Sequence, residues 1–149
     1  MEVRISSELR KNWRDDLMRV YADDVALAVT YGKGQAEVVV MSHDTWSTGE
    51  RRVPVPESKR SMMGSLAVRD NLRDVRETVL REGMHVLITR WGKPQQVIAP
   101  FTWTQQALPE LGEPEYGVLE PGERAGRRRA NVELGWSTAA EGIESDRRA

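Results

Sequence analysis

Apolar residues recur at helical spacing in the middle of the chain. Val68, Leu72, Val75 and Val79 follow one another at intervals of four, three and four residues, and mostly charged side chains fill the positions between them. This period places the apolar side chains on one face of a helix. Gly83 is expected to end that helix, because glycine readily adopts the left-handed conformation found at helix C-termini.

Two short apolar runs follow this helix. Residues 85–89 and 96–99 are rich in β-branched side chains, and Gly92 and Pro94 lie between the runs. β-Branched runs are typical of strands, and glycine and proline are typical of the turn that joins them. The pattern therefore predicts a β-hairpin after the helix.

The N-terminal part of the chain carries a weaker copy of the same pattern. Residues 9–15 align with residues 68–74 at an offset of 59, and Gly32 aligns with Gly92 at an offset of 60. The alignment predicts one additional residue between helix and strand in the second copy. A single inserted loop residue costs little free energy.

Each copy is predicted to contain the same elements. In the first, an apolar stripe predicts a helix that starts at Ser6, its N-cap, and runs to about residue 22; the stripe consists of Leu9, Trp13, Leu17, Val20 and Tyr21. Strands are predicted at residues 3–5, 25–30 and 36–41, followed by a short helix capped near Ser42 that carries Trp46. The second copy is predicted to open at residues 62–66 and to close with a helix over residues 101–108 that carries Trp103.

These repeats predict an α+β fold built from two tandem β-α-β-β-α units. One unit of about 45 residues is near the size below which a chain rarely buries enough surface to be stable alone. Two units sharing a core about an approximate two-fold axis would form an intramolecular pseudo-dimer. The predicted boundaries are residues 1–46 for the first unit, 47–60 for a linker, 61–108 for the second unit and 109–149 for a largely disordered tail rich in Gly, Pro, Glu and Arg.

The composition argues against several classes of protein. The 149 residues include no cysteine and only two histidines, so disulfides, thiol chemistry and a histidine-rich metal site are not expected. No catalytic motif is recognisable, Asp15-Asp16 and Asp23-Asp24 are interpreted as solvated charges, and we expect neither enzymatic activity nor a cofactor. No apolar run is long enough to span a membrane and the N-terminus lacks a signal-peptide core, so a cytoplasmic location is expected.

Charge is distributed unevenly between the repeats and the tail. Residues 1–103 carry a net charge of +2, whereas residues 104–149 carry −3. Val132, Trp136, Ala139 or Ala140, and Ile143 of the tail fall at helical spacing, which is typical of a segment that folds against a partner. The candidate partner-binding residues are Val132, Leu134, Trp136 and Ile143. The alternative is a solvated tail that binds nothing.

The second copy resembles the prevent-host-death (Phd/YefM) antitoxin family. The resemblance lies in two pieces about 20 residues apart, residues 67–72 (AVRDNL) and residues 86–94 (VLITRWGKP). The first copy is similar to a divergent member, with Thr30 in place of Arg90 and Gly34 in place of Pro94. The resemblance implies a small α+β protein that dimerises, binds palindromic operator DNA and neutralises a toxin through its C-terminal segment.

The resemblance also implies residues that contact double-stranded DNA. Arg10, Lys11 and Arg69 would lie at the helix starts, where backbone N–H groups and the helix dipole favour phosphate. The full set of candidate DNA contacts is Arg4, Arg10, Lys11, Lys33, Arg69, Arg90 and Lys93. The alternative is that Arg10 and Arg69 form ordinary surface salt bridges.

Three functions follow from this interpretation. The first is an antitoxin-like transcription regulator that binds operator DNA through the paired repeats and a toxin through the tail. The second is a DNA-binding regulator without a toxin, and the third is an assembly module that does not bind DNA. The sequence leaves the operator, the toxin and the presence of a homo-oligomer open.

Overall fold

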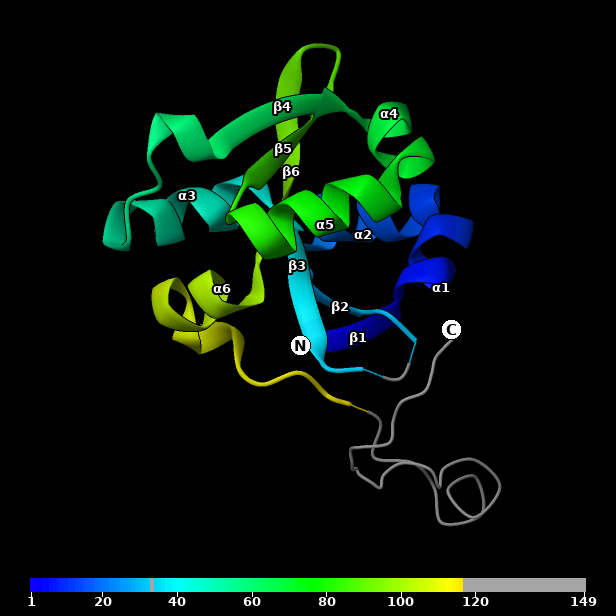
Figure 1. The fold of residues 1–149 in the computed structure, drawn as a ribbon, viewed down its shortest axis with the longest axis horizontal. Helices are drawn as coiled ribbons and strands as arrows, with labels where there is room; N and C mark the ends of the chain where they lie inside the picture. Colours follow the sequence, from blue (N-terminus) through cyan, green and yellow to red (C-terminus); the bar gives the residue numbers. More distant parts are fainter. Residues whose placement is uncertain (33, 117–149) are drawn as a thin grey trace.

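The structure is a computed structural model that describes residues 1–32 and 34–116. It is a mixed α+β fold in which a single six-stranded sheet is packed between helices (Figure 1). In chain order the elements are β1 (Glu2–Ile5), α1 (Ser6–Lys11), α2 (Trp13–Asp23), β2 (Leu27–Thr30), β3 (Ala36–Ser42), α3 (His43–Arg52), β4 (Arg60–Gly64), α4 (Ser65–Asp70), α5 (Leu72–Glu82), β5 (His85–Arg90), β6 (Lys93–Pro100) and α6 (Phe101–Ala107), with short 3-10 turns at Glu57–Lys59 and Pro109–Leu111.

The sheet has the strand order β1-β2-β3-β6-β5-β4. Its two outer pairs, β1 with β2 and β4 with β5, are parallel, and all other neighbours are antiparallel. Strands β3 and β6 meet in the middle, where Val40 lies opposite Ile98. Strand, helix pair, hairpin and helix therefore follow one another in the same order in residues 2–52 and in residues 60–107.

Helices cover the two faces of the sheet differently. Figure 1 shows α1 and α4 on one side of the sheet and α3 and α6 on the other. The first face carries a core to which both parts of the chain contribute through α1, α2, α4 and α5, and which includes Leu9, Trp13, Val68 and Leu72. The second face carries a core around Trp46 and Trp103, whose ring centroids lie 6.4 Å apart. Because both cores collect side chains from both parts of the chain, residues 1–32 and 34–107 pack together.

Each predicted long helix is divided in two. Asn12 and Asn71 interrupt the helical conformation with φ angles of −105° and −120°, so α1 is separate from α2 and α4 from α5. The amide of Asn71 donates to the carbonyl of Ala67 at 2.8 Å, and asparagine side chains that bond to the backbone in this way compete with a regular helix. The predicted order β-α-β-β-α is corrected to β-α-α-β-β-α.

The predicted cap at Ser6 is wrong. Ile5 precedes the first helical residue and no side chain caps α1, while the hydroxyl of Ser65 accepts a hydrogen bond from Trp13 Nε1 at 3.0 Å. The predicted cap at Ser42 is confirmed, since its hydroxyl accepts from the backbone N–H of Thr45.

The predicted position of the extra residue is also wrong. Thr30 pairs with Ile5 and Thr89 pairs with Gly64, each directly before its helix, so the offset of 59 continues through the strands. Both hairpins have a register shift at this point, before Thr30 and before Thr89. Thr30 therefore corresponds to Thr89 and not to Arg90. The two parts differ in length inside the hairpin turns, where chain length is least constrained by packing.

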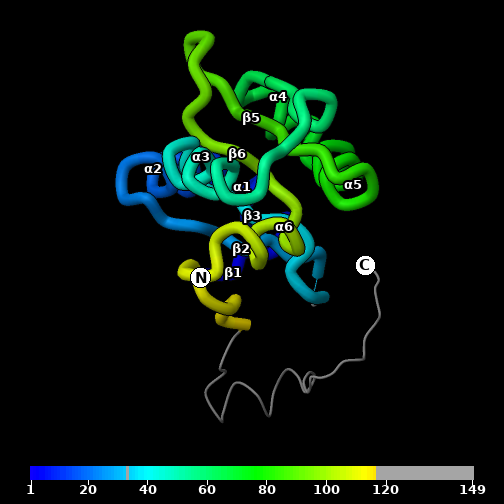
Figure 2. Tube along the Cα trace, turned by 90° about the vertical axis from the view of Figure 1, so that its left-hand side faces the viewer, coloured from blue at the N-terminus to red at the C-terminus, as the bar shows by residue number. Residues whose placement is uncertain are grey.

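The predicted linker and tail are both shorter than expected. Helix α3 continues to Arg52, into the segment predicted as linker, because Trp46 and Gly49 are buried against the second core. Residues 109–116 also pack on the domain. The N-terminal amino group donates to the carbonyl of Glu113 at 2.8 Å, and the hydroxyl of Tyr116 accepts from the N–H of Ala36 at 2.9 Å. Figure 2 shows this segment passing beside the N-terminus.

Candidate nucleic-acid interface

A groove lies where α1 faces α4 and α5, next to the turn of the first hairpin. Its volume is about 820 Å³, and we call it the basic groove. It is lined by Ile5, Ser6, Ser7, Arg10, Lys11, Tyr31, Gly32, Arg69, Asp70, Leu72, Arg73 and Arg76. Five of these twelve residues are basic and one is acidic, so the lining carries a net positive charge that suits a phosphate backbone.

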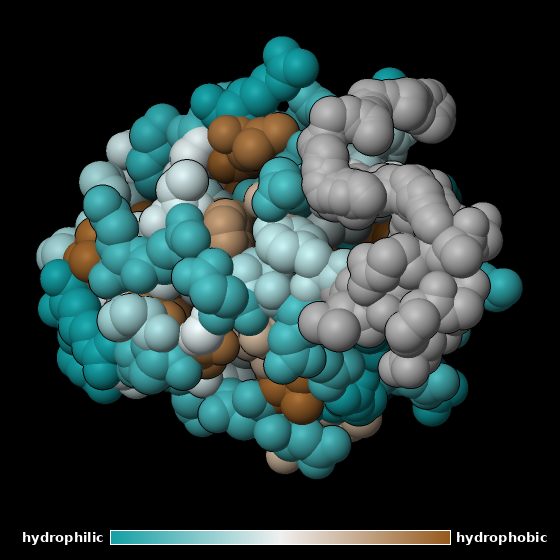
Figure 3. Space-filling model, turned by 90° about the horizontal axis from the view of Figure 1, so that it is seen from below, coloured by the Kyte–Doolittle hydropathy of each residue, from teal (hydrophilic) through white to brown (hydrophobic). Residues whose placement is uncertain are grey.

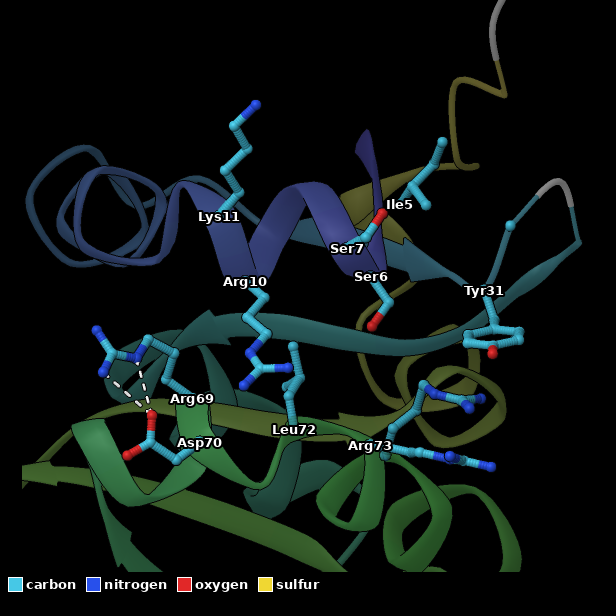
Figure 4. Close-up of a pocket in the computed structure, with 12 residues that line it drawn as sticks. Ile5, Ser6, Ser7, Arg10, Lys11, Tyr31, Arg69, Asp70, Leu72 and Arg73 are labelled. Atoms are coloured by element: carbon cyan, nitrogen blue, oxygen red, sulfur yellow. Dashed lines mark hydrogen bonds and ion pairs between the residues drawn. The ribbon is translucent and has the colours of Figure 1, made fainter. Parts of the chain in front are cut away.

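The basic side chains enter the groove from both parts of the chain. Arg10 points from α1 toward the helices of the second part, whereas Lys11 points away from them (Figure 4). Arg69 and Arg73 come from α4 and α5 on the opposite wall. Arg10 and Arg69, which occupy corresponding positions in the repeat, therefore line the same groove.

The groove arginines differ in whether a carboxylate neutralises them. Arg69 forms an ion pair of 3.1 Å with Asp70, and Arg76 is buried in an ion pair with Glu37. Among the described residues, Arg10, Lys11 and Arg73 form no ion pair. These three cations are available to an anionic ligand without first breaking a salt bridge.

The predicted placement of Arg10, Lys11 and Arg69 at helix starts is wrong. Because α1 and α4 end at Lys11 and Asp70, all three side chains belong to the last turn of a short helix. Cations at that end complement the helix dipole but receive no help from free N–H groups. Phosphate binding here would depend on the side chains alone.

The remaining predicted contacts are dispersed. Arg4 is engaged with Asp16 at 3.2 Å and with Glu2 at 3.3 Å, so it stabilises the fold and is not free. Lys33 lies outside the described residues. Arg90 and Lys93 are exposed at the facing ends of β5 and β6, on either side of the second hairpin turn and away from the basic groove. The Arg90 guanidinium lies over the ring of Trp91 at 5.1 Å.

Sequence reasoning missed Arg73 and Arg76 as groove residues. Arg69, Arg73 and Arg76 recur at intervals of four and three, which is the spacing of one helix face. The apolar pattern placed these charged residues outside the apolar face but did not reveal that they share a face of their own. Arg76 is only 6% exposed, and its guanidinium lies over the ring of Tyr31 at 4.4 Å, so it joins α5 to the first hairpin turn.

A second groove of about 580 Å³ is lined by residues of α2, α4 and the second hairpin, including its turn. We call it the apolar groove. Exposed apolar side chains line it: Met18 is 45% exposed, Tyr21 52%, Leu66 63% and Trp91 87%. Its charged residues are Arg14, Arg69 and Arg90, with no carboxylate among its lining residues.

The surface seen from below the view of Figure 1 has a different character. Figure 3 shows that hydrophilic side chains dominate this side, with separate apolar patches between them.

The second core contains one buried titratable side chain, His85. It is 3% exposed, and its Nδ1 accepts a hydrogen bond from Trp46 Nε1 at 3.0 Å, so the imidazole is neutral. Burial, with a smaller contribution from the charge of Arg60, lowers the pKa of His85 from 6.5 to about 4. A tryptophan donor and a lowered pKa suit a structural histidine.

Two kinds of site are missing from the described part of the chain. In residues 1–32 and 34–116, no helix combines the length and the apolar character required to cross a bilayer. Over the same residues, no three His, Asp or Glu side chains gather in a way that would hold a metal ion. The predicted partner-binding residues Val132, Leu134, Trp136 and Ile143 lie outside the described part of the chain.

Comparisons with protein-family models, with curated proteins and with solved structures found no match to this chain.

Proposed function

We propose that this chain is an antitoxin-like transcription regulator whose basic groove binds the phosphate backbone of operator DNA. The observation that carries the proposal is that Arg10 of one part of the chain and Arg73 of the other line the same groove, with Lys11 also among its lining residues, and none of the three forms an ion pair among the described residues. Three unneutralised cations in one concave surface favour an anionic, extended ligand.

The arrangement of the sheet supports the second element of the proposal, an intramolecular pseudo-dimer. The pairs Val38–Pro100 and Ser42–Gln96 lie on either side of Val40–Ile98, and an offset of 58 residues exchanges one pair for the other. A two-fold axis between Val40 and Ile98 would relate β1, β2 and β3 to β4, β5 and β6. A protein with approximate two-fold symmetry suits a DNA site with approximate palindromic symmetry.

The mode of DNA binding would be dominated by phosphate contacts. Arginine and lysine side chains that neutralise phosphates release counterions, so affinity falls steeply with salt concentration. Loss of one such contact lowers the slope of log K against log salt by about 1. Phosphate contacts would position the protein on the duplex but carry no sequence information. Recognition of the operator sequence would therefore depend on other residues or on the shape of the DNA.

Binding to duplex DNA from upstream of its own gene tests the proposal. Fluorescence anisotropy over a series of salt concentrations would compare the wild-type chain with Arg10→Ala and Arg73→Ala. Each variant is expected to bind about fivefold or more weakly and with a smaller salt slope. Arg51→Ala is a matched control, because Arg51 is an exposed arginine on α3, on the opposite face of the sheet.

Two results would contradict DNA binding in the groove. One is an affinity that does not depend on salt, and the other is an equal loss in Arg51→Ala and Arg10→Ala. No binding to upstream DNA at all would favour the assembly module over both DNA-binding functions.

The toxin requires a separate experiment. We propose that Val132, Leu134, Trp136 and Ile143 bind a small toxin encoded beside this gene. Co-purification of the neighbouring gene product with the full chain, lost on Trp136→Ala, would support this role. Intact DNA binding without such a partner would favour the regulator that acts alone. A cytoplasmic location remains part of the same proposal.

A further inference from the structure

The two grooves occupy equivalent positions in the two parts of the chain but differ in chemistry. An offset of 59 converts the basic-groove residues Ser6, Ser7, Arg10, Tyr31, Gly32, Leu72, Arg73 and Arg76 into Ser65, Leu66, Arg69, Arg90, Trp91, Trp13, Arg14 and Leu17, all of which line the apolar groove. Ser7 is thus replaced by Leu66, Gly32 by Trp91 and Arg76 by Leu17. The two grooves are thus formed by equivalent backbone positions, but the groove beside the second hairpin has an apolar lining.

Exposure of these substituted side chains is unfavourable unless something covers them. Leu66 and Trp91 are 63% and 87% exposed, and Met18 and Tyr21 extend the same surface. A contiguous exposed apolar patch with a polar rim is typical of a binding surface. The rim here is formed by Arg14, Arg69 and Arg90, so the occupant should combine apolar side chains with carboxylates.

We infer that the apolar groove binds residues 130–146 of the same chain. This segment, ANVELGWSTAAEGIESD, contains four acidic residues and no lysine or arginine. Its apolar side chains include Val132, Leu134, Trp136 and Ile143. Apolar anchors would cover Leu66 and Trp91, and the carboxylates would pair with the arginines of the rim.

The length of chain beyond the described residues permits this contact. Tyr116 is held against Ala36, beside the first hairpin turn, and fifteen residues separate it from Val132. Fifteen extended residues reach about 50 Å. A domain of this size has a radius of gyration of only about 13 Å, so the segment can pass from one hairpin to the other.

The segment favours the apolar groove over the basic groove because of its tryptophan and aliphatic side chains. The basic groove attracts carboxylates but offers Ser7 and Gly32 where the apolar groove offers Leu66 and Trp91. Self-binding in the apolar groove would leave the basic groove free for DNA. It would also make any tail-binding partner compete with the groove.

Engineered cysteines test this placement in the full chain, which contains no cysteine of its own. The test pair is Gln95→Cys with Ser137→Cys, since Gln95 lines the apolar groove and Ser137 follows Trp136. The matched control pair is Ser7→Cys with Ser137→Cys, which reports on the basic groove. A short bismaleimide is expected to cross-link the test pair within single chains much faster than the control pair.

Two further substitutions give the apolar groove the residues that the basic groove has at the equivalent positions. Adding Leu66→Ser and Trp91→Gly to the test pair should slow cross-linking about fivefold or more, because each removes an apolar anchor. Both positions are exposed, so the fold should remain intact, which circular dichroism and the melting temperature would verify.

Several outcomes would overturn the inference. Equal or faster cross-linking of the control pair would place the segment in the basic groove. Cross-links found only between chains would mean that a second copy of the chain occupies the groove. If only single-stranded DNA protects the thiol of the Gln95→Cys variant, the groove would instead bind nucleic acid. Absence of any cross-link would also refute it. The experiment contains neither operator nor toxin, so it fails or succeeds independently of the proposed function.

Discussion

Helices α2 and α5 bury the same four positions but fill them with different chemistry. In α2 the buried residues are Trp13, Asp16, Leu17 and Val20, and in α5 they are Leu72, Val75, Arg76 and Val79, each 59 residues later. Where α2 has a buried carboxylate, α5 has valine, and where α5 has a buried guanidinium, α2 has leucine. The two parts therefore share backbone geometry and apolar positions, while single buried charges differ between them.

The strongest test of this comparison asks whether the two parts unfold together. Leu9 and its equivalent Val68 both lie in the core shared by α1, α2, α4 and α5. Leu9→Ala is expected to lower the free energy of unfolding by about 3 kcal/mol, because it leaves a cavity in a fully buried site. Urea denaturation should still show one transition by both tryptophan fluorescence and far-UV circular dichroism.

Val68→Ala serves as the partner variant and should have a smaller effect, since valine loses less volume. Two separate transitions in either variant would mean that the parts are independent domains, contrary to the shared core.

A second test uses a position where the second part has a histidine and the first has a side chain that does not titrate. His85 corresponds to Ala26, and its pKa is lowered from 6.5 to about 4. The unfolded chain binds a proton that the folded chain does not bind in this range, so stability falls as the pH decreases from about 6.5 to about 4. The loss should reach up to about 3 kcal/mol at the acidic end.

Urea denaturation at about pH 7 and at about pH 4 measures this loss. His85→Gln keeps a hydrogen-bond acceptor for Trp46 but does not titrate, so its stability should change less over the same interval. An equal pH dependence in both proteins would assign acid sensitivity to other groups.

A third test replaces the charges of the first part with the apolar residues of the second. Arg4 and Asp16 form an ion pair, and their equivalents are Met63 and Val75. Arg4→Met alone leaves the carboxylate of Asp16 buried without its closest partner and should cost about 2 kcal/mol, less than a fully buried pair because Arg4 is partly exposed. Arg4→Met with Asp16→Val should restore or exceed wild-type stability.

Thermal and urea denaturation of the two single variants and the double variant would measure the coupling. If the losses of stability in the single variants add up in the double variant, then methionine and valine cannot replace the Arg4–Asp16 ion pair in the first part.

The smallest expected effect separates Arg10 from its equivalent Arg69. Both line the basic groove, but Arg69 is paired with Asp70. Arg69→Ala should therefore weaken DNA binding less than Arg10→Ala, and Asp70→Ala should strengthen it, each by about 1 kcal/mol or less. Anisotropy at a single low salt concentration would rank these three variants, and a larger loss in Arg69→Ala than in Arg10→Ala would reverse the assignment.

The sequence predicted those features that depend on local periodicity. Gly83 ends α5 in the left-handed conformation with a φ of 70°, and Val86 and Val97 lie in paired strands, as the apolar pattern indicated. The conformation at these positions depends on the residue itself and on its near neighbours in the sequence, so a local pattern is sufficient to predict it.

Features that depend on distant contacts were missed. Asp16 was interpreted as a solvated charge, yet it is 4% exposed beside Arg4 of β1, and Tyr21, counted with the apolar stripe, is 52% exposed. The segment before Tyr116 was expected to be disordered because of its proline and glutamate content. It packs through contacts with Met1 and Ala36, which lie far away in sequence. Pattern reasoning contains no information about such partners.

The shared core has a consequence for how the protein responds to dilution. Subunits of a two-chain assembly separate when their concentration falls below the dissociation constant, and their folding then becomes concentration-dependent. Here Leu9 and Val68, which belong to opposite parts, are held together by one covalent backbone. Their association is a first-order process, so a cell with only a few copies of this polypeptide retains the complete folded unit.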